Sequence, residues 1–169
     1  MEAREAILSR RSVRKFTDKE VEAEKVEMLI EAADAAPSAC NKRPVNFYVI
    51  RNKEILSALS ASGRFTAMAS PLAIVVAGDT SRTLPRSWGE YWIHDAAAAT
   101  ENILIMANAL GLGSCWCGIH LQPEVMKKVQ ELLGLPEGIV PFSLIRIGYP
   151  AENPPPHEGY APERVKFFD

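Results

Sequence analysis

The stretch that decides the fold runs from His94 to Ile119 and reads HDAAAATENILIMANALGLGSCWCGI. It begins inside a helix predicted over about Glu90 to Leu110, which is apolar on almost every face. Its polar side chains form one narrow stripe, in which His94, Glu101 and Asn108 lie seven residues apart. A helix of this composition is buried, and in so small a domain one sheet cannot cover it. We therefore expect a long buried central helix and a homodimer whose second subunit completes its cover.

Two glycines, Gly111 and Gly113, end this helix and lead into a strand predicted over Ser114 to Ile119. Gly111 suits a left-handed helix C-cap. In the dinucleotide-binding fingerprint the glycines instead follow a strand and open a helix, whose N-terminus meets the pyrophosphate. The order of elements is reversed here, so we do not expect a nicotinamide-binding Rossmann domain.

The rest of the chain alternates between helical and strand patterns. The helix over Glu22 to Ala36 has apolar residues at the helical period and stops at Pro37. The tail from Pro150 is rich in proline and irregular. We predict one domain over residues 1–169 of the α+β class, with a mixed central sheet flanked by helices and an extended C-terminal tail. The other predicted helices are Glu2–Ser9, Glu54–Ser62 and Pro123–Leu133, and the other strands are Asn46–Ile50, Leu72–Ala77 and Ser143–Ile147.

Composition limits the possible functions. The chain has 169 residues, 47% of them apolar and 24% charged, with a net charge of −2. This balance suits a soluble globular protein and argues against general nucleic-acid binding, which needs a basic face. No signal peptide is evident, and the longest apolar stretch, Ile93 to Leu112, is interrupted by polar residues that make it a poor membrane span. Three cysteines without a secretory context indicate free thiols and a cytoplasmic protein.

Two polar segments are candidate sites. RRSVRKF, from Arg10 to Phe16, has four cations and a serine hydroxyl in seven residues. These groups could form a phosphate site, because converging arginines and a hydroxyl bind phosphate, or an ordinary solvated patch; the residues favour neither. PSACNKRP, from Pro37 to Pro44, has the composition of a turn that ends a helix and is a weak signal by itself.

The sequence offers no metal site. Cys115 and Cys117 lack the further paired ligands that zinc requires, and their spacing is not that of a thioredoxin-like pair. Alternate strand residues face the same side, so we expect two small side chains on one face of a buried strand. The isolated histidines His94, His120 and His157 are expected to be structural.

Taken together, several blocks resemble the FMN-dependent nitroreductase family, in its compact form. These blocks are RRSVRKF, APSACNKRPVNFYVI, HDAAAATENILIMANALGLGSCWCGI, SLIRIGYPAENPPP and a terminal arginine before an aromatic residue. The resemblance runs almost from end to end. It implies an α+β homodimer that binds two FMN molecules at the subunit interface.

The resemblance also assigns cofactor contacts near the two ends of the chain. Arg10, Arg11 and Ser12 match contacts to the FMN phosphate and ribityl chain. Arg14 matches the cation beside the pyrimidine end of the isoalloxazine, where it stabilises negative charge on the reduced ring. Arg164 matches a second cation for the phosphate.

Further contacts are implied in the middle of the chain. Pro37, Ser38 and Asn41 match a loop that the partner subunit contributes to the same flavin. Cys117 and Gly118 match a segment whose backbone lies by flavin N5 and O4, where an N–H would orient the ring. No match indicates a role for Arg64.

The activity that the resemblance implies is hydride transfer from NADH or NADPH through flavin N5 to a small acceptor, such as a nitroaromatic compound or a quinone. The two half-reactions would share one site in a ping-pong cycle, with no catalytic side chain. Trp88, Tyr91 and Trp92 could line the substrate site or pack the start of the long helix. Relatives with other chemistry, such as dehalogenases, enone reductases and a flavin-fragmenting enzyme, and a non-catalytic flavin-binding or redox-sensing dimer remain alternatives.

Overall fold

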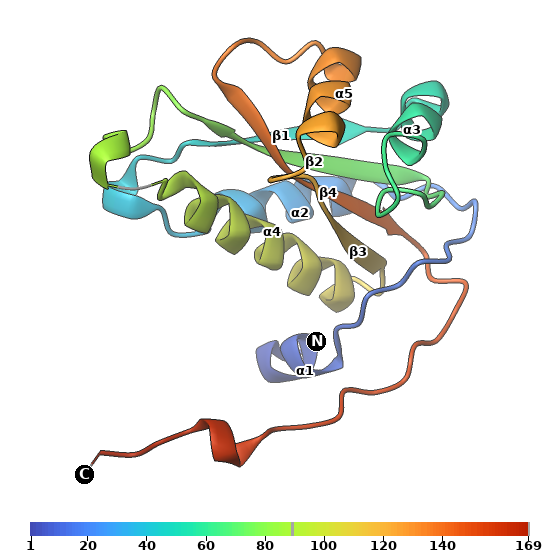
Figure 1. Cartoon of the computed structure of the whole chain (residues 1–169). Helices are drawn as coiled ribbons and strands as arrows, with labels where there is room; N and C mark the ends of the chain where they lie inside the picture. The colour runs from blue at the N-terminus through green and yellow to red at the C-terminus, as the bar shows by residue number, and fades with distance from the viewer. Residues whose placement is uncertain (89, 169) are drawn as a thin grey trace.

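A four-stranded sheet forms the centre of the protein (Figure 1). The structure, a computed structural model, describes residues 1–88 and 90–168. The strands lie in the order β1-β2-β4-β3, and each neighbouring pair is antiparallel. Within the described chain, the parallel pairing of the mixed sheet that we expected is limited to one isolated bridge between Ser12 and Ser114. The strands are β1 (Val45–Ile50), β2 (Leu72–Asp79), β3 (Gly113–Gly118) and β4 (Ile139–Gly148).

Helices cover both faces of the sheet, which confirms the α+β class. The helices α2 (Ala23–Asp34) and α4 (Trp92–Ala109) lie on one face, and α3 (Lys53–Ser60) and α5 (Pro123–Leu133) lie on the other (Figure 1). Side chains alternate between the two faces of a strand, so each face has its own core. Ile74 of β2 joins the core under α2 and α4, whereas the next residue, Val75, joins the core under α3 and α5.

The long helix α4 is packed against the sheet at its start. The Trp92 side chain is 2% exposed, and a Cβ atom added at Gly78 of β2 would lie 2.2 Å from its ring. Trp92 therefore fills the space of a missing side chain and belongs to the core, whereas Trp88 and Tyr91 are exposed. The helix is followed by Gly111 with φ of +73°, which confirms the left-handed residue expected there.

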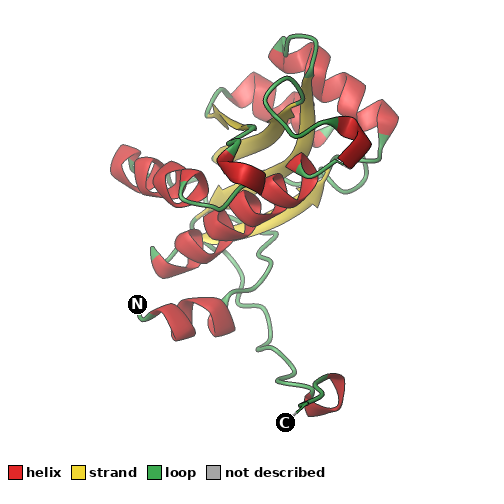
Figure 2. Ribbon diagram, turned by 90° about the vertical axis from the view of Figure 1, so that its left-hand side faces the viewer, coloured by secondary structure: helices red, strands yellow, loops and turns green. Residues whose placement is uncertain are grey.

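The N-terminal helix packs against α4, whereas the C-terminal tail extends away from the body. The helix α1 (Ala3–Ser9) packs on α4, where the Asn108 Nδ2 donates to Ala6 O at 2.9 Å and to Ser9 Oγ at 2.7 Å. The C-terminal tail runs away from the body beyond α1, as predicted, and carries one short turn of helix, η3 (Pro162–Arg164) (Figures 1 and 2). In the described part of the chain, no helix has both the length and the hydropathy that a membrane crossing requires.

Candidate functional site

The cationic segment Arg10 to Lys15 is fixed to the body of the protein. Val13 N donates to Ser114 O of β3 at 2.9 Å, and the buried Val13 side chain lies directly over Gly113. A Cβ atom at Gly113 would lie 2.8 Å from Val13 Cβ, so only glycine allows this approach. The Glu152 carboxylate accepts from Arg14 N at 2.6 Å and from Lys15 N at 3.2 Å. The segment is therefore an ordered strip and not a loose tail.

The arginines of this strip differ in how far their donors are already used. Arg10 Nε lies 3.1 Å from a Glu101 carboxylate oxygen on α4. The Arg11 guanidinium donates to Leu8 O at 2.9 Å and to Pro155 O at 3.1 Å. The exposed Arg14 guanidinium has one long contact, to Ser12 O at 3.4 Å. Arg14 is thus the most available of the three cations.

The outer edge of β3 is open beyond this strip. Backbone groups of alternate strand residues point to opposite edges, and the carbonyl of Ser114 faces the cationic strip. It follows that the backbones of Trp116 and Gly118 face the same outer edge, whereas that of Cys117 faces β4. Gly118 is exposed, and no atom lies within 4 Å of a Cβ added there. The edge therefore offers the N–H groups of Trp116 and Gly118 as donors, with free space on the side-chain face of Gly118, whereas the Gly118 carbonyl already accepts from Gln122 Nε2.

The two cysteines of β3 form a buried pair, as the sequence predicts. Cys115 is 4% exposed and Cys117 2%. A hydrogen bond from Cys117, together with the charge of Arg14, lowers the pKa of the Cys115 thiol to about 7. The same hydrogen bond and burial raise the pKa of Cys117. No set of three His, Cys, Asp or Glu side chains in the described chain is placed to hold a metal ion.

The loop that starts at Pro37 has a strained backbone. It contains the short helix η1 (Ala39–Asn41), and Cys40, Asn41 and Arg43 have φ of 50°, 52° and 48°. These values lie in the left-handed region, which side chains disfavour. Asp95 of α4 anchors the loop, because its Oδ1 accepts from Ala39 N at 2.9 Å.

The predicted site residues lie in separate groups along α4. Glu101, the partner of Arg10, and Asp95, the partner of Ala39, are six residues apart in this helix. Six residues correspond to about 9 Å along a helix axis and about 120° around it. The cationic strip and the loop therefore meet different faces of α4, and one chain does not bring them together. Arg164 belongs to neither group: it lies on the tail, 82% exposed at its side chain and 4.0 Å from Glu163.

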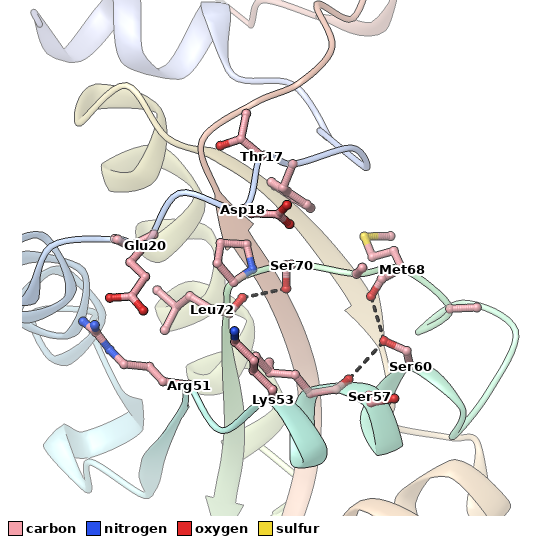
Figure 3. A pocket seen from close by; sticks show the side chains of 16 residues that line it. Thr17, Asp18, Glu20, Arg51, Lys53, Ser57, Ser60, Met68, Ser70 and Leu72 are labelled. Atoms are coloured by element: carbon pink, nitrogen blue, oxygen red, sulfur yellow. Dashed lines mark hydrogen bonds between the residues drawn. The ribbon is translucent and has the colours of Figure 1, made fainter.

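A separate cavity of about 860 Å³ lies between residues 16–21, α3 and residues 67–72 (Figure 3). The charged side chains of Asp18, Glu20, Arg51 and Lys53 line it. None of the predicted site residues does so. No local pattern indicates this cavity, because its walls come from three separate segments of the chain.

Several polar residues that join distant parts of the chain were also missed. Glu152 contacts Arg14 across 138 positions of sequence, and nothing in the proline-rich tail marks it. Arg146 of β4 is fully buried and donates to Ser60 Oγ at 2.9 Å and to Thr66 O at 3.2 Å, although its strand reads as apolar. Asp95 had a usable signal: it is an acidic residue at the start of an otherwise apolar helix.

Comparison with known proteins shows which family has this sequence and fold. The sequence pattern of the nitroreductase family matches residues 7–63 and 61–149. A protein of Methanothermobacter thermautotrophicus, provisionally named NADH dehydrogenase/NAD(P)H nitroreductase, is 39% identical over 98% of this chain and 86% of its own length.

Solved structures agree with the sequence match. A Parabacteroides distasonis protein with the same provisional name superposes with a TM-score of 0.90 at 34% identity, over 98% of this chain and 96% of that one. An FMN-dependent nitroreductase of Clostridium difficile R20291 superposes with a TM-score of 0.85 at 32% identity, over 97% and 98%. Shared sequence, fold and chain length lead to one conclusion: the chain belongs to the nitroreductase family.

Proposed function

We propose that the protein is an FMN-dependent oxidoreductase that transfers hydride from NADH or NADPH to a small electron acceptor, such as a nitroaromatic compound or a quinone. One observation carries the proposal. The cationic strip is fixed against β3, directly beside an open strand edge that ends in the exposed Gly118. The FMN-dependent relative from Clostridium difficile, 32% identical, supports the same cofactor.

The residues of the strip fit the polar half of FMN. A phosphate is bound best by guanidinium and hydroxyl donors, which Arg10, Arg11 and Ser12 supply. Arg10 uses Nε for Glu101, and a guanidinium has five N–H donors, so others remain for a phosphate. Glu101 also balances part of the positive charge when no anion is bound.

The edge of β3 fits the flat half of FMN. A planar ring can approach Gly118 because no side chain stands there and the space beside it is open. Bound FMN would accept hydride from a reduced nicotinamide and pass it to the acceptor in a second half-reaction at the same face. Arg14 would stabilise negative charge on the ring, and the Gly118 N–H would orient the ring at the strand edge. The chain's own side chains need supply no nucleophile.

We infer that a second subunit completes the site. Pro37, Ser38 and Asn41 lie on a different face of α4 from the cationic strip of their own chain, so they would serve the flavin held by the partner's strip. Arg164 would reach a phosphate once the tail folds against the dimer. The proposed active form is therefore a homodimer with two shared sites.

An absorption spectrum of the purified protein tests this function. The protein is mixed with FMN, freed of excess ligand and treated with NADH or NADPH without oxygen. We expect flavin bands that bleach with at least one of the two nucleotides. Flavin bands that survive both would indicate a binding or sensing protein. The absence of flavin after mixing with FMN would contradict the proposal.

A further inference from the structure

Asp95 is an unusual residue in the first turn of α4. It is 6% exposed, in a helix whose other buried residues are almost all apolar. Its Oδ1 accepts one hydrogen bond, from Ala39 N, and within the described chain its Oδ2 has no partner. Burying a carboxylate with a single hydrogen bond is unfavourable for folding, and the favourable helix dipole at the first turn offsets only part of this cost, so helix stability alone does not explain why an acid occupies this position.

Asp95 holds the strained loop that starts at Pro37. Cys40, Asn41 and Arg43 all have left-handed backbones, and such conformations persist only where the surroundings enforce them. The loop has one side-chain bond of its own, in which Ser38 Oγ accepts from Arg43 N at 2.9 Å. The exposed Arg43 guanidinium pairs with Asp34 of α2. Asp95 supplies the buried side-chain bond from the loop to α4. It also lines, with Pro37, Ser38 and Arg43, a cavity of about 20 Å³ beneath the loop.

The position of this bond matters for the site. Ala39 lies between Ser38 and Asn41, the two polar residues that the proposed function assigns to the flavin of the partner subunit. A bond at Ala39 N therefore fixes the backbone on both sides of it. Ser38 is half-buried and Asn41 is exposed, so their side chains are not held by a core of their own.

We propose that Asp95 is a positioning residue, which holds the Pro37–Asn41 loop in its strained shape so that the loop binds the FMN of the other subunit. This inference rests on the proposed function, because it needs a flavin site shared by two chains. Asp95 itself touches no cofactor and acts through Ala39. Its effect appears in the site whose Arg14 belongs to the partner.

The first test compares Asp95→Ala with a matched change in the same helix. Thr100→Val removes a fully buried hydroxyl of α4 whose hydrogen bonds go to Ala96 O and Ser143 Oγ and not to the loop. FMN affinity is measured by fluorescence titration of each apoprotein, together with its thermal unfolding. We expect Asp95→Ala to weaken FMN binding about tenfold, the loss of one charge-assisted hydrogen bond, and Thr100→Val to weaken it less than about threefold.

A conservative variant distinguishes the loss of this hydrogen bond from a general folding defect. In Asp95→Asn the side-chain oxygen can still accept from Ala39 N, so we expect FMN affinity within about threefold of the unchanged protein. Equal losses of FMN affinity in Asp95→Ala and Thr100→Val would overturn the inference. So would a tenfold loss in Asp95→Asn that matched the loss in Asp95→Ala, because the carboxylate would then act in some other way than through this bond.

Mixed dimers test whether Asp95 acts on the other subunit. Asp95→Ala and Arg14→Ala chains are unfolded together, refolded and titrated with FMN. In a mixed dimer, one site combines an intact Arg14 with an intact loop, so random pairing restores high affinity to roughly one site in four. No recovery, with both parents folded, would overturn action across subunits. Failure of the unchanged protein to bind FMN would instead contradict the proposed function.

Discussion

Arg14 is the residue on which the proposed chemistry depends most. Its guanidinium is exposed and has one weak intramolecular contact. We expect Arg14→Ala to weaken FMN binding about tenfold and to lower the reduction potential of the bound flavin, because a cation beside the ring favours its anionic reduced form. Lys15→Ala is the control, since it removes a neighbouring exposed cation. Normal affinity and potential in Arg14→Ala would contradict the role of this residue.

The thiol pair gives a second prediction for single residues. The pKa of Cys115 is lowered to about 7 by the hydrogen bond from Cys117, so one thiolate should form as the pH rises through about 7. Removing that donor in Cys117→Ala should move the transition upward, toward the ordinary value of 9.0. Thiolate ultraviolet absorbance of the apoprotein measures this, in a Cys40→Ser background that removes the exposed thiol. An unchanged midpoint would show that the hydrogen bond is not the cause.

At this scale the sequence showed which residue types could bind a ligand, but not what holds them. The expected pairing of Cys115 and Cys117 on one face follows from the two-residue period of a strand. The contacts of Arg10 with Glu101 and of Arg14 N with Glu152 join positions about 90 and 138 residues apart, and no local pattern encodes them.

Substitutions at two glycines of β3 should have different effects on stability and on FMN binding. Gly113→Ala places Cβ 2.8 Å from Val13, so we expect a loss of about 1–3 kcal/mol in unfolding free energy, typical of overpacking, and weaker FMN binding. Gly118→Ala has no atom within 4 Å of the new methyl group. It should leave the stability of the apoprotein unchanged and still reduce FMN affinity.

Denaturant unfolding and FMN titration of both glycine variants test this contrast. If Gly118→Ala bound FMN as tightly as the unchanged protein, the cofactor would not lie against this part of β3. If Gly113→Ala kept its stability, the close approach of Val13 would matter little.

The elements themselves were largely predictable. Apolar patterns located the five α-helices and four strands of the described residues, with ends that differ by a few residues. The largest difference is β4, predicted over Ser143–Ile147 and observed over Ile139–Gly148. The first part of β4 was not predicted because it contains Pro141, and proline is unfavourable inside a sheet. In the structure Pro141 lies where the register with β2 shifts, between Val76 and Ala77. The direction of strand pairing had no local signal, which is why a mixed sheet was expected.

The assembly of the whole molecule gives the last prediction. Ile7 and Leu8 of α1 are each 53% exposed beside α4. In a dimer that covers this side they would be buried, so the double change Ile7→Glu and Leu8→Glu should favour monomers and weaken FMN binding without removing any core contact. Val49→Glu, at a 41% exposed residue of β1, is the control. Light scattering measures the mass, and an unaltered dimer in the double variant would place the interface elsewhere.

At the largest scale, the sequence alone predicted a partner from the composition of one helix, and the structure adds a geometric reason. The loop at Pro37 and the strip at Arg14 are both ordered, yet they meet different faces of α4. Recognition of the family came from blocks spread over the whole chain. Recognition of the family did not point to the separate cavity of about 860 Å³, which the block RRSVRKF reaches only at Phe16.

The open edge of β3 has a consequence for the protein before it acquires its ligand. Unpaired strand edges join readily to the edges of other chains, and native proteins usually block them with charge, proline or a covering loop. Between Trp116 and Gly118 this edge has neither charge nor proline, although Gln122 Nε2 donates to Gly118 O, and Trp116 adds a partly exposed indole ring. Freshly made chains that wait for a flavin should therefore be the form most prone to aggregate, and flavin supply would then limit how much usable protein a cell accumulates.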